Sequence, residues 1–214
     1  MRFGILGPAN GDLQALEKAA SHLLFDHAAE QVVYLGPDDA LDRVVFDWAK
    51  RLVGDDPSDG GIFARAAKSC GKASPEGILN HVANERARER LKRLRCLPAP
   101  DSRTVEIIDG RVAVLLYDKG LLDEDDILAA VLLIFGKSDG PIVRQVGART
   151  FISPGQISAG KGGAALLSDG VSGEVNICIF DPGGELVDSQ KIAIPKTGKF
   201  RVIGDKAPSS DDRP

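Results

Sequence analysis

Two short apolar runs, each followed directly by a Gly-Pro pair, mark the first half of the chain. They are Phe3–Leu6 and Gln31–Leu35. Continuous apolar runs of this length are typical of buried parallel strands. Each run is followed by apolar residues at helical spacing, which predicts one helix over about 13–28 and another over about 41–52. The chain therefore begins with a β-α-β-α pattern.

A loop and then a helix are expected between residues 54 and 94. Residues 54–74 are rich in Gly, Asp and Ser, which predicts a loop with about one turn of helix. A helix should then run over residues 75–94, because Ser74 can cap it and Pro75 suits its first position. Its expected apolar stripe consists of Ile78, Leu79, Val82, Leu91 and Leu94. Its polar face is basic, with Arg86, Arg88, Arg90, Lys92, Arg93 and Arg95.

From residue 104 onward the hydrophobic period shifts towards two, the period of β-strands. Residues 105–108 and 112–116 flank an Asp109-Gly110 turn, which predicts a hairpin. A short acidic helix is expected around 123–130. Further strands are expected at 131–135, 142–146, 150–153, 164–168, 175–180 and 186–194. The last stretch, 205–214, has Pro, Ser and Asp without apolar periodicity and is interpreted as a disordered tail.

Composition and length favour one globular domain. The chain has 214 residues, of which 43% are hydrophobic and 27% charged, as in soluble globular proteins. We therefore expect a single domain over residues 1–204. The sequence has no stretch long enough to suggest a membrane span, and its N-terminal apolar run is too short for a signal peptide. These features predict a cytoplasmic protein without membrane insertion.

Cysteine spacing and net charge narrow the possible partners. Cys70, Cys96 and Cys178 lie far apart without CxxC or CxxH spacing, which argues against a structural zinc site or a disulfide framework. The formal net charge of −4 gives no general attraction for nucleic acid or anionic lipid. A nucleic-acid partner is therefore not expected.

Helices in the first half and strands in the second predict an α/β sandwich of two packed sheets flanked by helices. The segment from Phe3 to Leu16, FGILGPANGDLQAL, resembles the opening of calcineurin-like metallophosphoesterases, in which a strand ends in Asp-x-His-Gly-Asn-x-x-Ala-Leu. Pro8 stands where that family has a metal-binding Asp, and Asn10 stands where it has a His. The resemblance is to the branch of small phosphodiesterases and retromer-scaffold-like proteins.

Two later segments carry the same resemblance. Val32 to Asp38, VVYLGPD, is similar to the family's strand followed by Gly-Asp, with Pro37 in place of the Asp that bridges two metals. LIFGKSDGP, followed by FISPGQIS, is similar to the family's Gly-His-Thr-His…Asn-Pro-Gly-Ser sequence. Lys137 and Asp139 occupy its two histidine positions. The resemblance covers about 1–45 and 110–195, so residues 54–104 are interpreted as an atypical helical insert.

The resemblance implies the fold without its metal ligands. The family's third element has no equivalent between residues 54 and 100, and its fourth, near Asp118, has no histidine. Two-metal hydrolysis needs Asp, His and Asn ligands, and the proline side chain has no donor atom. We therefore expect no bound metal and no cofactor. Lys137 either neutralises Asp38, Asp118 or Asp139 in place of the lost metal charge, or points into solvent.

The leading hypothesis is thus a catalytically inactive metallophosphoesterase-fold protein that binds another protein or acts as a scaffold. A candidate partner surface is the basic helix at Arg88, Arg90 and Arg93, although interspersed glutamates favour a merely solvated face. One alternative is a divergent metal-dependent phosphodiesterase or phosphatase with an acidic site made of Asp38, Asp118 and Asp139. Another is a small-ligand sensor that uses the vacated cleft.

Overall fold

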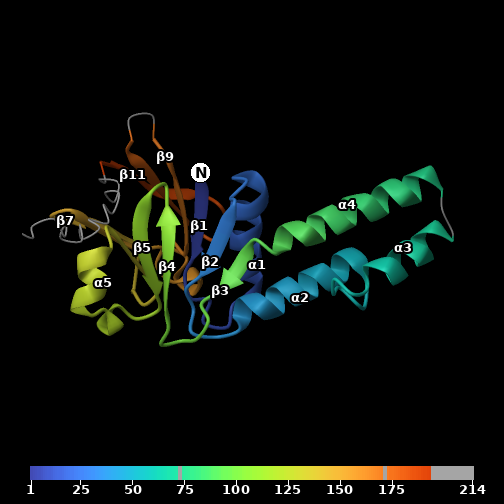
Figure 1. The fold of residues 1–214 in the computed structure, drawn as a ribbon, viewed down its shortest axis with the longest axis horizontal. Helices are drawn as coiled ribbons and strands as arrows, with labels where there is room; N and C mark the ends of the chain where they lie inside the picture. The colour runs from blue at the N-terminus through green and yellow to red at the C-terminus, as the bar shows by residue number, and fades with distance from the viewer. Residues whose placement is uncertain (72–73, 171–172, 194–214) are drawn as a thin grey trace, which may run out of the picture.

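The protein is described by a computed structural model over residues 1–71, 74–170 and 173–193. Two sheets form its centre (Figure 1). The first has the strand order β11-β10-β9-β1-β2-β3, and the second β4-β5-β6-β8-β7. The first sheet contains β1 (Arg2–Leu6), β2 (Gln31–Tyr34), β3 (Leu94–Cys96), β9 (Ala164–Asp169), β10 (Val175–Phe180) and β11 (Leu186–Ile192). The second contains β4 (Arg103–Ile108), β5 (Arg111–Leu116), β6 (Leu132–Phe135), β7 (Ile142–Val146) and β8 (Arg149–Ser153).

Side-chain alternation along the strands builds a four-layer core. In β1, Phe3 and Ile5 enter the cluster between the sheets, whereas Leu6 faces the helices on the outer side. In β6, Leu132 and Ile134 likewise join the inter-sheet cluster, whereas Leu133 and Phe135 face outward. Successive residues of a strand point to opposite faces, so each central strand supplies two layers. The two-sheet α/β sandwich expected from the sequence is therefore confirmed.

The helices cover the outer faces of the sheets and extend beyond them. The α-helices are α1 (Leu13–Ser21), α2 (Ala40–Val53), α3 (Ile62–Cys70), α4 (Pro75–Leu91) and α5 (Glu124–Ala129). A π-helical turn, η1 (His22–Asp26), prolongs α1, and two 3₁₀ turns are η2 (Lys119–Leu121) and η3 (Ile157–Ala159). Within the described ranges, none of these helices combines the length and apolarity that crossing a membrane requires.

The hairpin and the buried strands agree with the sequence pattern. β4 and β5 pair in antiparallel register with Val105 opposite Val114. Their turn has Asp109 at φ 48° and Gly110 at φ 71°, the left-handed pair that a type I′ turn requires. The parallel pairing of β1 with β2 and of β5 with β6 also fits their continuous apolar runs. The expected end of the last strand at 194 and the expected tail at 205–214 lie outside the described residues.

The segment between β2 and β4 differs from the expectation. Residues 62–70, expected to be mostly loop, form the nine-residue helix α3. The helix expected to reach residue 94 ends at Leu91, and Leu94 begins the short strand β3, which pairs with β2. Ile78, Leu79 and Val82, expected to be a buried stripe, are exposed. The reason is that α3 and α4 project away from the sandwich, where no sheet covers them (Figure 1). We call residues 54–71 and 74–92 the helical arm.

Candidate functional site

The loops that follow β1, β2, β6 and β8 meet backbone to backbone. A Cβ added to Gly7 would lie 1.8 Å from the carbonyl oxygen of Gly155, and one added to Gly136 would lie 2.4 Å from that of Leu35. Only glycine permits such close approach. The ends of β1 and β8, and those of β2 and β6, therefore lie in direct contact. We call loops 7–11, 36–39, 136–141 and 153–158, together with Asp118, the strand-end cluster.

The positions where the resemblance expects metal ligands supply few donor atoms. Pro8 is buried, and its backbone carbonyl accepts a hydrogen bond from the N–H of Ile157 at 3.0 Å. Pro37 is half-buried. Asn10 lies at φ 50°, and its amide donates to the side chains of Gln156 at 3.0 Å and Ser158 at 3.2 Å. The Asn10 side chain thus joins the loop after β1 to the loop after β8.

Asp38 has a structural partner that the sequence reasoning missed. The fully buried Tyr34 hydroxyl donates to the Asp38 carboxylate at 2.8 Å and accepts from the backbone N–H of Ala9 at 3.0 Å. Burial, together with the bond to Asp38, raises the pKa of Tyr34 well above its usual value. A tyrosine within an otherwise apolar strand was the available signal, because a buried hydroxyl requires a partner.

Lys137 faces Asp118. Its ammonium group forms an ion pair with the Asp118 carboxylate, and its backbone N–H donates to the Tyr117 carbonyl at 2.8 Å. The other oxygen of Asp118 accepts from the Gly120 N–H at 2.9 Å. These bonds, that to Lys137 foremost, hold the pKa of Asp118 below its usual range, and the pKa of Lys137 is raised. Of the three carboxylates expected as partners of Lys137, Asp118 is the one it binds.

The carboxylates expected to form an acidic metal site do not gather. In the three described ranges, no group of three or more His, Cys, Asp or Glu side chains could hold a metal ion. The physical reason lies in their partners, because Asp38 is engaged by Tyr34 and Asp118 by Lys137. Asp139 is exposed on the loop after β6. Asp38, Asp118 and Asp139 therefore do not form one cluster of three carboxylates.

The hollow beside these residues is small. A pocket of about 220 Å³ is lined by Pro37, Asp38, Asp42 and Cys96 and by the turn at 97–100. Typical ligand pockets enclose about 300–1,000 Å³. Burial, and the nearby Asp42 carboxylate, raise the pKa of the Cys96 thiol to about 12, so this thiol is not a ready nucleophile. The pocket gives little support to a small-ligand sensor at this place.

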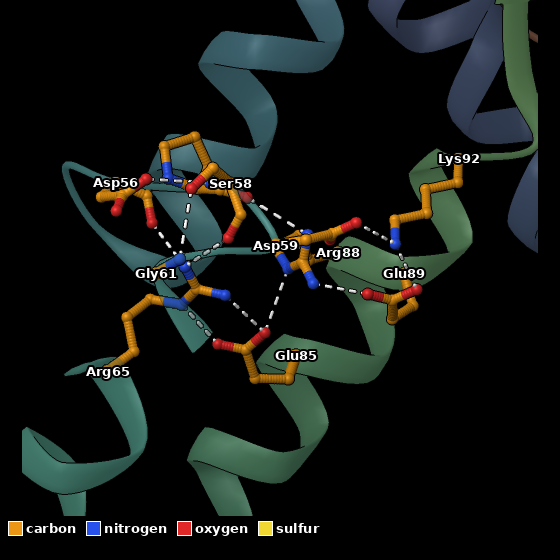
Figure 2. A network of polar contacts seen from close by, with 10 residues as sticks. Asp56, Ser58, Asp59, Gly61, Arg65, Glu85, Arg88, Glu89 and Lys92 are labelled. Atoms are coloured by element: carbon orange, nitrogen blue, oxygen red, sulfur yellow. Dashed lines mark hydrogen bonds and ion pairs between the residues drawn. The ribbon is translucent and has the colours of Figure 1, made fainter. Parts of the chain in front are cut away.

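The helical arm contains a network of charged side chains, of which Arg65, Glu85 and Arg88 are largely buried (Figure 2). Glu85 of α4 accepts from Arg65 of α3 at 2.6 Å and from Arg88 one turn later at 3.0 Å. Arg88 also donates to Asp59 in the loop before α3, at 2.8 Å. The Arg65 guanidinium lowers the pKa of Glu85. The network thus fixes α3, α4 and loop 54–61 against one another.

The expected partner surface at Arg88, Arg90 and Arg93 is not one free basic face. Arg88 is only 5% exposed, because its guanidinium is enclosed by the network. The Arg90 guanidinium lies 5.9 Å from the centre of the Phe25 ring, and Arg93 donates to the Ala29 carbonyl at 3.3 Å. Arg88 is therefore enclosed within the arm, whereas Arg90 and Arg93 are exposed and contact the sandwich at the base of the arm.

Comparisons with known proteins found similar solved structures but no similar sequences. No family model and no curated protein matches the sequence. The chain is similar to the structure of a novel archaeal phosphodiesterase, with 13% identity, 90% of this chain and 100% of that chain covered, and a TM-score of 0.43. It is similar to a predicted phosphoesterase from Streptococcus pneumoniae TIGR4, with 13% identity, 90% and 98% covered, and a TM-score of 0.48. It is also similar to Vps29 from Chaetomium thermophilum, with 12% identity, 96% and 100% covered, and a TM-score of 0.45. At these values the comparisons assign the chain neither a family nor an activity.

Proposed function

We propose that this chain is a degenerate member of the metallophosphoesterase superfamily that hydrolyses no phosphoester and instead binds another protein. One observation carries the proposal. At the strand-end cluster, the positions that should hold metal ligands contain Pro8 and Pro37, and the Lys137 ammonium pairs with Asp118 nearby. Two-metal hydrolysis requires ligands that hold two cations and lower the pKa of a bound water. Proline offers no side-chain donor atom, and an ammonium group repels a divalent cation.

In this proposal, polar residues of the strand-end cluster now have structural roles. Asn10 joins two loops, Asp38 accepts from the buried Tyr34 hydroxyl, and Asp118 is neutralised by Lys137. Asp139 remains as an exposed carboxylate. We infer that the cluster now stabilises the junction of the two sheets, and that the protein works in the cytoplasm.

The proposed partner surface is the helical arm, which belongs to the atypical insert at 54–104. Phe63 is 84% exposed and Leu79 is 69% exposed, and Ile78 and Val82 are exposed as well. Exposed apolar side chains gathered on one projecting element are typical of protein interaction sites. We therefore shift the expected surface from the arginines to these apolar residues, with Arg90 and Arg93 at its base.

Turnover of a phosphodiester tests the catalytic half of the proposal. Purified protein supplied with Mn²⁺ is expected to hydrolyse bis-p-nitrophenyl phosphate no faster than the buffer. Turnover that disappears in Asp38→Ala or Asp139→Ala would establish the acidic-site enzyme instead.

Affinity capture tests the binding half. The double variant Phe63→Ser/Leu79→Ser is expected to lose at least one protein that the wild type retains, with both amounts measured by quantitative mass spectrometry. Leu186→Ser removes a similarly exposed apolar side chain from β11 and serves as the matched control. An unchanged set of retained proteins in the arm variant would remove the arm from the proposed function.

A further inference from the structure

Two histidines meet at the π-helical turn after α1. The His27 backbone N–H donates to the His22 carbonyl at 3.1 Å, a bond that spans five residues. In an α-helix, residues five apart point to different sides, but this wider turn brings them onto one side. As a result, Nε2 of His22 lies 3.0 Å from Nε2 of His27.

The Asp26 carboxylate fixes the tautomer of His22. Its Oδ2 lies 3.0 Å from Nδ1 of His22. An ionised carboxylate can only accept, so Nδ1 carries the hydrogen and neutral His22 presents its lone pair at Nε2. A carboxylate behind the far nitrogen of an imidazole is the arrangement that orients histidine ligands in metal sites.

Packing holds both rings in place. The Phe180 ring of β10 lies with its centre 5.1 Å from that of His22 and 4.7 Å from that of His27. Gly184 closes the other side, where an added Cβ would lie 2.8 Å from Nδ1 of His22. The His22 side chain remains 19% exposed and borders an open hollow of about 460 Å³. Two nitrogen donors are thus held in place, and the ring of His22 has open space beside it.

We propose that His22 and His27, oriented by Asp26, form a binding site for a divalent transition-metal ion of the Zn²⁺ class. In a tetrahedral site with Zn–N distances of about 2.0–2.1 Å, two nitrogens lie about 3.3 Å apart. The observed separation of 3.0 Å needs only a small opening and a change of the His27 tautomer. Hard cations such as Mg²⁺ prefer oxygen ligands and are excluded by the imidazole pair.

The site is independent of the strand-end cluster and shares no residue with it. Two cations are near the site: Arg2, whose guanidinium donates to the His27 carbonyl at 2.8 Å, and Lys18, which lines the same hollow as His22 together with Glu17. The Asp26 charge offsets that of Arg2. With two protein ligands, binding is expected to be weaker than in four-ligand structural sites, with water completing the coordination sphere.

The test uses the full chain without an affinity tag, titrated with Zn²⁺ alone by calorimetry. The wild type is expected to bind one equivalent, and Mg²⁺ should give no heat of binding. His22→Gln and His27→Gln should each abolish saturable binding. Asp26→Asn should weaken it about 10- to 100-fold, since it removes only the orienting carboxylate. The third histidine, His81 of α4, provides the matched control, and His81→Gln should bind as the wild type does.

A folding control keeps the result interpretable. The melting temperature of each variant is measured without metal. When Zn²⁺ is added, the wild type and His81→Gln should gain thermal stability, Asp26→Asn should gain less, and His22→Gln and His27→Gln should gain none. Absence of one-equivalent binding in the wild type would overturn the site. Equal binding by folded His22→Gln and His27→Gln would overturn it as well, because the ion would then lie elsewhere.

Discussion

The sandwich and the helical arm are held together by different forces. In the sandwich, three apolar clusters fill the spaces between four layers, and the strand-end loops pack backbone against backbone. In the arm, the buried side chains include two arginines, Arg65 and Arg88, that share the Glu85 carboxylate. Among the large apolar residues of the arm, Leu91 is buried at its base, whereas Phe63, Ile78, Leu79 and Val82 lie on its surface.

This difference determines how each region should respond to damage. Apolar burial is spread over many side chains and tolerates small losses, but it offers no room for added volume. Few charged groups support the arm, and because Arg65 and Arg88 share Glu85, removal of that one carboxylate breaks several bonds at once. We therefore expect the sandwich to fail as one cooperative unit and the arm to open locally.

The largest effect is expected from Gly7→Ala. The new Cβ would overlap the Gly155 carbonyl oxygen, a backbone atom that cannot turn away. We expect a loss of about 3 kcal/mol or more in the free energy of unfolding, measured by urea denaturation. Gly140→Ala is the control, because a Cβ there meets nothing within 4 Å. Equal stability of the two variants would show that the strand-end loops do not pack as described.

A smaller and local effect is expected from Glu85→Gln. The amide keeps the shape of Glu85 but loses the charge that faces Arg65 and Arg88. The free energy of local opening of α3 and α4 should fall by about 2 kcal/mol, as measured by native-state hydrogen exchange, while the amides of β1 and β6 stay protected. Glu76→Gln in the exposed first turn of α4 is the control. Loss of protection in both regions together would mean that the arm and the sandwich form one unit.

The smallest effect concerns the Lys137–Asp118 pair, which solvent screens. The folded-state pKa of Asp118 is lowered, so ionised Asp118 stabilises the fold above its unfolded pKa, and this contribution is lost as the pH falls through the folded-state pKa. In Lys137→Met the pKa of Asp118 should rise towards its usual value in a carboxyl NMR titration. Lys161→Met should leave it unchanged. If the pKa of Asp118 is unchanged in Lys137→Met, the two side chains do not form the ion pair described here.

The local hydrophobic pattern was sufficient to predict the strands of the sandwich. Strands such as β1 and β6 are buried on both faces and therefore appear in the sequence as continuous apolar runs. The pattern failed for β3, which pairs with β2 but has only three residues, too few for a period to be recognised. The pattern also failed to predict that α4 projects away from the sheets. Ile78 and Leu79 look like a core stripe in sequence, but whether a sheet lies beneath them depends on where the helix projects.

The candidate site could be located from the sequence, but its bonds could not be assigned. Gly-Pro pairs after two apolar runs placed Pro8 and Pro37 at strand ends. Three carboxylates were equally plausible partners for Lys137, and the choice of Asp118 depends on how the loop after β5 approaches the loop after β6. The pairing of His22 with His27 depends on the π-helical turn η1, which a helical period over residues 13–28 does not predict.

The central claim is that the strand-end cluster has lost its metals, and a Mn²⁺ titration tests it most directly. Calorimetry is performed on the double variant His22→Gln/His27→Gln, in which the proposed imidazole site is absent. We predict no stoichiometric binding, because Pro8 and Pro37 supply no donor atoms and Lys137 neutralises Asp118. Stoichiometric Mn²⁺ binding that is lost in Asp38→Ala or Asp118→Ala would contradict the account and show that the cluster still holds a metal ion.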